Sequence, residues 1–357
     1  GLANDIRGNL LAPDSEGQVR AMRRAYASVG WQPQDVDYIE CHGTGTPVGD
    51  AVEISSLTRL WENGSWKTGQ CPIGSVKSMI GHLLTAAGAA ALIKTLLGMR
   101  HGVLPPACHF RKAPENSPLP KSPFRVQTEA QPWKIREGLF SRRAAVSAFG
   151  FGGINGHMLL ESWNPDLYCR KHRKKTAPAS RTPSADLQNP ARPASPVPIA
   201  VVGMGAAFGS IDSVREFQET VFQGKTIFIQ RPEARWKGCD SEVENLIDGK
   251  AKWGGYMGKL SVPLGKFHIP PIEMPDILPQ HLLMLKVAAD AMQDASLPLR
   301  GVRPEMGAIV GIDFDFEATD FHLRWALPRW IEAWKRRPER PDPEALQNLL
   351  ESLQDGC

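Results

Sequence analysis

A thiol and an imidazole stand side by side in the stretch CHGTGTPVGD, at Cys41 and His42. A cysteine is a strong nucleophile once it is a thiolate, and a histidine can take its proton. Direct neighbours on an extended strand, however, point to opposite faces. We therefore expect His42 to act with partners from elsewhere in the chain, and the Cys41 side chain to pack away from the site.

Two further candidates lie in the stretch IGSVKSMIGHLLTAAG. His82 is expected at the start of an apolar helix, where the positive end of the helix dipole disfavours imidazolium. A neutral ring there can donate a hydrogen bond to a developing oxyanion without acting as a base. Lys77 precedes it on the connecting loop and could hold a carboxylate or tune nearby groups. Two histidines and a lysine beside a glycine-rich turn indicate thioester or carbonyl chemistry.

Two other glycine-rich stretches suggest rival chemistry. GMGAAFG, residues 203–209, follows an expected strand and invites a dinucleotide, which would make the protein an NAD(P)-dependent oxidoreductase. Its spacing is G-x-G-x-x-x-G, and no acidic residue ends a second strand at the usual distance, so a tight structural turn is the better account. GFGGING, residues 150–156, leads into a strand and lacks the helix N-terminus that would hold a phosphate.

The elements around these residues alternate between helix and strand. The expected elements are a helix over 14–30 capped by Asp14 or Ser15 and ended by Gly30, a strand over 36–43, a strand and loop over 71–78, a helix over 81–102 and a strand–turn–strand unit over 142–162. Strands that alternate with helices and are apolar on both faces indicate a layered α/β domain.

A change in composition divides the chain. Residues 164–197 are rich in Pro, Ser, Ala and basic side chains and are expected to form a disordered linker between segments 1–163 and 198–357. The run RKHRKK at its start has no interleaved aromatic residues, so it favours a solvated linker over nucleic-acid binding. The second segment should contain strands over 198–205 and 306–312, helices over 213–224 and 276–295, and a charged helical stretch over 327–357.

Composition sets the outer limits. The 357 residues suffice for about two cores, and 42% hydrophobic with 22% charged residues is the balance of a soluble globular protein. Apolar runs are too short for a membrane helix and GLANDIRGNL is not a signal peptide, so we expect a cytoplasmic protein. The six cysteines form no CxxC or Cys/His cluster, and no metal site is expected.

Together the motifs ECHGTGTPVGDAVE, IGSVKSMIGHLLTAAG and SAFGFGGINGH resemble, in the same order, the β-ketoacyl synthases of polyketide and fatty-acid assembly lines. The set is highly specific and spans nearly all of residues 1–163. The resemblance implies a thiolase-like fold with layered αβαβα architecture that normally works as a homodimer. It also implies that no cofactor is bound directly, because acyl carrier protein delivers substrates on its phosphopantetheine arm.

The resemblance assigns roles residue by residue. His42 and His82 match the histidines that help decarboxylate the malonyl extender and stabilise the enolate, and Lys77 matches a lysine that supports hydrogen bonding in the site. The remaining matched positions are Thr44, Thr46, Phe149, Gly150 and Phe151 in the substrate channel and gate, and Asp50, Glu53 and Asn155 as structural residues near the site. Two departures, Met79 for the familiar Asn and Thr85 for the usual Glu, put the polar surroundings of the site in doubt.

The family nucleophile, a cysteine in a T-A-C-S-S turn upstream of HGTGT, has no counterpart in the chain. We therefore expect a fragment that begins within a domain, holds two of three catalytic groups and is inactive alone. The second segment resembles the start of another synthase domain through PIAVVGMGAAFG, LPQHLLMLKVAADAMQDASL and GAIVGI. It is most similar to the chain-length-factor domains that follow the ketosynthase in polyunsaturated-fatty-acid-type synthases, which lack the nucleophile and pair with the active domain.

The resulting expectation is part of a multidomain synthase that performs decarboxylative Claisen condensation of acyl and malonyl thioesters. Its partners would be acyl carrier protein domains, a second copy and the chain-length-factor-like domain, with no nucleic acid and no membrane span. Two alternatives stay open: a modular type I polyketide synthase, and a noncatalytic scaffold that dimerises and docks carrier proteins. Two incomplete domains are preferred to one permuted domain, because the second segment ends before its nucleophile turn.

Overall fold

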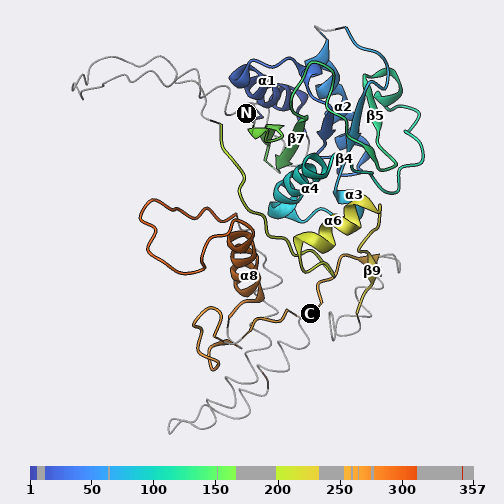
Figure 1. Cartoon of the computed structure of the whole chain (residues 1–357). Coiled ribbons are helices and arrows are strands. Elements are labelled where there is room, and N and C mark those ends of the chain that lie inside the picture. Colours follow the sequence, from blue (N-terminus) through green and yellow to red (C-terminus); the bar gives the residue numbers. More distant parts are fainter. Residues whose placement is uncertain are drawn as a thin grey trace, which may run out of the picture. The chain divides into compact units, whose positions relative to one another are not determined.

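The computed structural model describes residues 1–5, 13–62, 65–150, 152–165, 198–232, 253–258, 260–263, 265–274, 277–311 and 348. They fall into two compact units, which are described separately: Gly1–Val201 with Gln218–Thr226, and Val202–Phe217 with Ile227–Cys357. Figure 1 shows their helices and strands, coloured along the sequence from blue at the N-terminus to red at the C-terminus. The linker expected over 164–197 and the helical stretch expected over 327–357 lie almost entirely outside the described residues.

The first unit is built on a six-stranded mixed sheet in the order β1-β8-β7-β2-β3-β5. The strands are β1 (Leu2–Asn4), β2 (Tyr38–Glu40), β3 (Cys71–Gly74), β5 (Phe124–Val126), β7 (Arg143–Gly150) and β8 (Ile154–Glu161). Strands β7, β2, β3 and β5 run parallel, while β8 is antiparallel to both of its neighbours. The C-terminal ends of β7, β2 and β3 therefore lie at one edge, where α/β proteins build their sites. A separate small sheet pairs β4 (Val103–Leu104) with β6 (Gln131–Pro132).

Helices cover both faces of the six-stranded sheet (Figure 1). On one face α1 (Ser15–Val29) stacks Tyr26 on His157 of β8, with ring centroids 5.7 Å apart. On the other face α4 (Ala87–His101) brings Gly88 so close to Ala148 that an added Cβ would lie 3.3 Å from that of Ala148. Ser147, which pairs with His157, and Ala148 are adjacent in β7 and so point to opposite faces. The expected α/β class with helix–sheet layering is confirmed.

The ends of α1 agree with the sequence prediction. Asp14 is its N-cap and accepts a hydrogen bond from the backbone N–H of Glu16. Gly30 ends it at φ 70°, a left-handed conformation that glycine adopts without strain, and its N–H returns to the carbonyl of Tyr26. Local residue types suffice here because capping is a local interaction.

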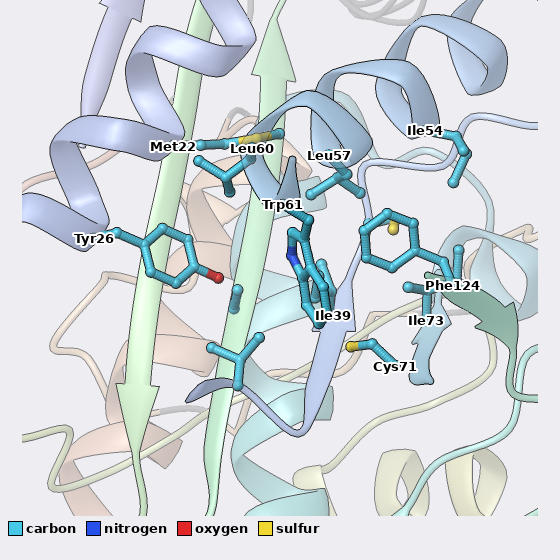
Figure 2. Close-up of a cluster of buried hydrophobic side chains, with 13 residues drawn as sticks. Met22, Tyr26, Ile39, Ile54, Leu57, Leu60, Trp61, Cys71, Ile73 and Phe124 are labelled. Atoms are coloured by element: carbon cyan, nitrogen blue, oxygen red, sulfur yellow. The ribbon is translucent and has the colours of Figure 1, made fainter. Parts of the chain in front are cut away.

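A hydrophobic core cluster lies between α1, α2 (Pro47–Trp61) and the sheet. Figure 2 shows Trp61 of α2 reaching down among the side chains of both helices and of the strands. Its ring meets that of Phe124 edge to face at a centroid distance of 5.3 Å. Truncating a buried tryptophan of this kind typically costs about 3–5 kcal/mol. Cys41 belongs to the same cluster and is 5% exposed, so the prediction that its side chain packs inside is confirmed.

In the second segment the expected helices form as α6 (Val214–Phe222) and α8 (Pro279–Asp294). Two short strands, β9 (Ile229–Gln230) and β10 (Trp253–Gly254), pair with each other. The strands expected over 198–205 and 306–312 are wrong for the described residues. A strand forms only where another backbone pairs with it, and Ile199 and Ile309 are almost fully exposed.

The GMGAAFG stretch itself lies against α8 in the second unit. A Cβ at Gly203 would stand 2.2 Å from the carbonyl oxygen of Ala291, and one at Gly205 would stand 2.2 Å from that of Val287. These glycines therefore allow one backbone to approach another closely. This supports a structural role over a dinucleotide site.

Candidate active site

Three segments that follow parallel strands bring the predicted residues together. His42 follows β2, Lys77 opens the short helix α3 (Lys77–Ile80) after β3, and Phe149 lies near the end of β7. The His42 ring centroid is 5.4 Å from that of His82, nearly perpendicular to it, and 5.5 Å from that of Phe149. Sequence motifs that are far apart in the chain thus converge at one edge of the sheet.

The turn that carries His42 is anchored by Glu53. The two carboxylate oxygens accept the backbone N–H groups of His42 and Gly43, each at 2.8 Å. Gly43 has φ 44°, and a Cβ there would stand 2.8 Å from Cβ of Ser75, so only glycine fits without a shift. Glu53 comes from α2 and is buried, which ties the turn rigidly to that helix.

The other polar residues of HGTGT also serve the turn. Thr46 caps α2 by accepting the N–H of Gly49 at 3.2 Å, and its hydroxyl lies 3.0 Å from that of Thr44. Asp50 accepts the N–H of Gly45 at 3.1 Å. Asp50 and the two threonine hydroxyls therefore all form hydrogen bonds within the turn.

Both imidazoles are neutral at physiological pH. Burial, followed by the positive charge of Lys77, lowers the pKa of His42 to about 3. The backbone N–H of Phe149 donates to Nδ1 of His42 at 3.3 Å, so the ring proton resides on Nε2. Burial and then Lys77 also lower the pKa of His82. Each ring can therefore present an N–H donor to an oxyanion without being charged.

The expected helix start at His82 is wrong. Helix α4 begins at Ala87, and His82 lies between α3 and a 3-10 turn, η2 (Leu84–Ala86). The backbone of Leu83 and Leu84 is left-handed, with φ 60° and 46°, which interrupts a right-handed helix. The helix dipole therefore does not account for a neutral His82; burial and Lys77 do.

Lys77 is 9% exposed, and burial lowers its pKa while the carboxylates of Glu40 and Glu53 oppose that shift. A lysine in this position is no ordinary solvated surface residue. Its positive charge also favours negative charge developing near the two histidines.

The remaining predicted residues lie around this group. Asn155 pairs with Phe149 across the β7–β8 ladder, and its Nδ2 donates to the Asp5 carboxylate at 2.7 Å. Gly150 is exposed at the end of β7, and Phe151 lies outside the described residues. Of the two departures from the family pattern, Met79 is fully buried in the core and Thr85 is exposed.

One buried polar group was missed from the sequence. Glu40 at the end of β2 forms a salt bridge with Lys94 of α4 at 2.8 Å, and both side chains are wholly inaccessible. Tyr38 donates to the same carboxylate oxygen. The sequence did contain a signal for this pair, because Glu40 is a charged residue in an apolar strand and Lys94 is a charged residue in an apolar helix. Charged residues are rarely fully buried unless they are paired.

Within the described residues, no group of three or more His, Cys, Asp and Glu side chains could hold a metal ion. No helix in this part of the chain is long and apolar enough to cross a membrane.

Comparison with known proteins finds similar sequences over the whole chain. It is 31% identical over 358 residues to a polyunsaturated fatty acid synthase protein of Thraustochytrium sp., a match that covers 99% of this chain and 16% of the relative. It is 44% identical over 151 residues to a phenolphthiocerol/phthiocerol polyketide synthase protein of Mycobacterium tuberculosis, covering 42% of this chain and 10% of the relative. The chain thus spans less than a fifth of the length of these relatives.

Among solved structures, the ketosynthase from module 6 of the Bacillus subtilis bacillaene synthase matches 46% of this chain and 31% of its own, at 39% identity and a TM-score of 0.44.

Two family models match in succession. Residues 2–111, which hold His42, Lys77 and His82, match the beta-ketoacyl synthase C-terminal domain. Residues 197–329 match the beta-ketoacyl synthase N-terminal domain, and the two matches together cover more than half of the chain. The chain belongs to the β-ketoacyl synthase family.

Proposed function

We propose that the chain is part of a multidomain fatty-acid or polyketide synthase that condenses an acyl thioester with a malonyl thioester. The observation that carries the proposal is the pair of neutral imidazoles 5.4 Å apart beside Lys77. Neutral N–H donors in a partly buried site suit a reaction that develops an enolate oxyanion. Proton abstraction by imidazole would instead call for a ring with a pKa near working pH.

The reaction has two half-steps. A cysteine thiolate of the complete enzyme attacks the acyl thioester on the phosphopantetheine arm of a carrier protein, forming an enzyme thioester and releasing the arm as a thiolate, which takes up the proton that the cysteine had lost. Malonyl-carrier protein then loses carbon dioxide, and the electron pair of the broken carbon–carbon bond forms an enolate. The enolate carbon attacks the enzyme thioester, the cysteine thiolate leaves, and β-ketoacyl-carrier protein results. Splitting the reaction in this way replaces one difficult step with two easier ones.

His42 and His82 act in the second half-step. The Nε2–H of His42 and a ring N–H of His82 donate to the thioester oxygen as it gains charge, and they stabilise the enolate more than the neutral thioester. Burial, together with the positive charge of Lys77, keeps both rings unprotonated. Phe149, with Gly150 after it, forms the gate beside His42, and Thr44 with Thr46 shapes the turn at the channel.

We also propose the domain arrangement behind this activity. Residues 1–163 are the C-terminal half of a ketosynthase domain, 164–197 a linker, and 198–357 the first half of a chain-length-factor-like domain that pairs with it. The support is the order of the two family matches and the continuous similarity to the fatty acid synthase relative. The proposed partners are the carrier protein and a second copy of the synthase, and the proposed location is the cytoplasm. We also propose that the nucleophilic cysteine is supplied by the complete enzyme and that this chain is inactive alone.

A modular polyketide synthase is the second candidate. It is supported by the sequence identity of 38–44% to polyketide synthases of Bacillus and Mycobacterium over 42–48% of the chain, which is higher than the 31% to the fatty acid synthase relative. A reactive cysteine in the second domain of the full-length protein would favour this candidate over a chain-length-factor-like partner.

The test uses the full-length synthase with malonyl-carrier protein and follows loss of carbon dioxide by mass spectrometry. His82→Ala should abolish decarboxylation, whereas His101→Ala, an exposed histidine at the end of α4, should leave it unchanged. Unchanged decarboxylation in His82→Ala would contradict the proposal, and no decarboxylation by the unaltered synthase would favour a noncatalytic scaffold.

A further inference from the structure

A wholly buried ion pair lies beneath the loop that carries Lys77. Lys94 Nζ lies 2.8 Å from Oε2 of Glu40, and the hydroxyl of Tyr38 donates to the same oxygen at 2.5 Å. Lys94 also donates to the Tyr38 hydroxyl at 3.2 Å. The three groups form a closed triangle in which each polar atom has a partner.

The second oxygen of Glu40 reaches the site loop. Oε1 accepts the backbone N–H of Val76 at 2.6 Å, and Val76 directly precedes Lys77. A Cβ at Gly74 would stand 2.4 Å from the Tyr38 hydroxyl and 3.3 Å from Lys94 Nζ, so β3 passes directly over the triangle. Glu40 therefore connects helix α4 to the segment that leads into Lys77 and His82.

A buried ion pair contributes little net stability to a core, because the desolvation of both charges offsets their attraction. Removing two charges from water is unfavourable, and well-packed apolar residues of similar volume often stabilise a protein equally well. The triangle lies at the C-terminal end of β2, two residues before His42. Its position next to the site, rather than elsewhere in the core, indicates a role in that site.

We propose that Glu40, fixed by Lys94 and Tyr38, is a positioning residue that holds the Val76–Lys77 backbone and supplies buried negative charge to the Lys77 ammonium. This inference rests on the proposed condensation activity. Glu40 does not touch the reacting atoms; it acts through Lys77 and the loop to His82.

The charges around Lys77 agree with this role. Burial lowers its pKa, and the carboxylate of Glu40 opposes that shift more strongly than that of Glu53, while Lys94 adds to the lowering. Glu40 thus helps to keep Lys77 protonated in a site where desolvation favours the neutral amine.

The test compares two half-steps in the full-length synthase: acylation of the nucleophile and decarboxylation of malonyl-carrier protein. The double variant Glu40→Gln/Lys94→Met removes both charges together, and the Gln oxygen can still accept the Val76 N–H. We expect the kcat of decarboxylation to fall about tenfold, because Lys77 loses the carboxylate that opposes its desolvation most strongly, while its KM and the acylation rate stay within about twofold. Thr95→Val is the matched control, since Thr95 is also fully buried on α4 and its hydroxyl donates to the carbonyl of Ala91 within that helix.

Two further variants keep the test decisive if the double variant does not fold. Tyr38→Phe removes one donor to Glu40 without changing any charge, and should lower the kcat of decarboxylation while sparing acylation. Lys94→Arg keeps the positive charge, so its kcat of decarboxylation should be higher than that of the single variant Lys94→Met, which leaves Glu40 without its ion-pair partner. Wild-type decarboxylation in the double variant or Tyr38→Phe, or an equal loss of both half-steps, would overturn the positioning role.

The outcome separates this inference from the proposed function. If His82→Ala loses decarboxylation while the Glu40 and Tyr38 variants retain it, only the positioning role fails. If His82→Ala retains decarboxylation, the proposed function itself fails.

Discussion

The backbone N–H of Phe149 donates to Nδ1 of His42 at 3.3 Å, linking the end of β7 to the turn after β2. This bond fixes which ring nitrogen carries the proton and directs Nε2–H away from Phe149. The residue that we propose as the gate thus also sets the tautomer of the histidine beside it.

The first prediction concerns pH. Because burial lowers the pKa of His42 to about 3, its ring stays neutral well below the range in which a free imidazole titrates. The rate of malonyl decarboxylation by the full-length synthase should therefore show no inflection from the His42 imidazole between about pH 5.5 and 8. A pH–rate profile of kcat measures this. An inflection near pH 6.5 that disappears in His42→Gln would show that the ring titrates during turnover and contradict the neutral-donor role.

The second prediction concerns the anchor of the HGTGT turn. Glu53→Ala removes the acceptor of two backbone N–H groups and should lower the free energy of unfolding by about 2–4 kcal/mol. Urea unfolding of the full chain measures the change. Glu62→Ala, at the exposed end of the same helix, is the control and should change stability by less than about 0.5 kcal/mol. Equal effects of the two substitutions would show that the turn does not depend on Glu53.

The third prediction concerns Cys41. Its side chain lies in the core, and burial raises the pKa of the thiol well above its ordinary value, so thiolate is scarce. Iodoacetamide or an acyl thioester should leave Cys41 unmodified in the native chain, while the half-buried Cys108 reacts faster than Cys41. Peptide mass spectrometry gives the modified positions. Modification of Cys41 at the rate of Cys108, or stoichiometric acylation there, would make Cys41 a nucleophile.

Local signals were enough to predict much of the first unit. The caps of α1 and the glycine-rich turn with His42 depend on residues close in sequence, so residue type and spacing reveal them. The broken helix before Ala87 depends on left-handed leucines, and leucine gives no signal for that conformation. The Glu40–Lys94 pair joins residues 54 positions apart, and neither residue alone indicates its partner.

In the second segment, local residue types predicted a strand that the structure does not have over the described residues 198–205. PIAVVGMG has the composition of a buried strand, but its Ile199 and Val202 are exposed in the structure. Apolar β-branched residues indicate a strand only when a neighbouring strand supplies the hydrogen bonds, and that partner is not part of the local sequence.

The central claim is that the two histidines stabilise an enolate rather than activate the thiol. The most direct measurement is the ratio of malonyl decarboxylation to nucleophile acylation in His42→Ala, relative to the unaltered full-length synthase. Removing one donor to an oxyanion costs about 10²–10³ in rate, so decarboxylation should fall by that factor while acylation changes far less. If acylation falls as far as decarboxylation, His42 acts on the thiol, and its role as an enolate-stabilising donor is contradicted.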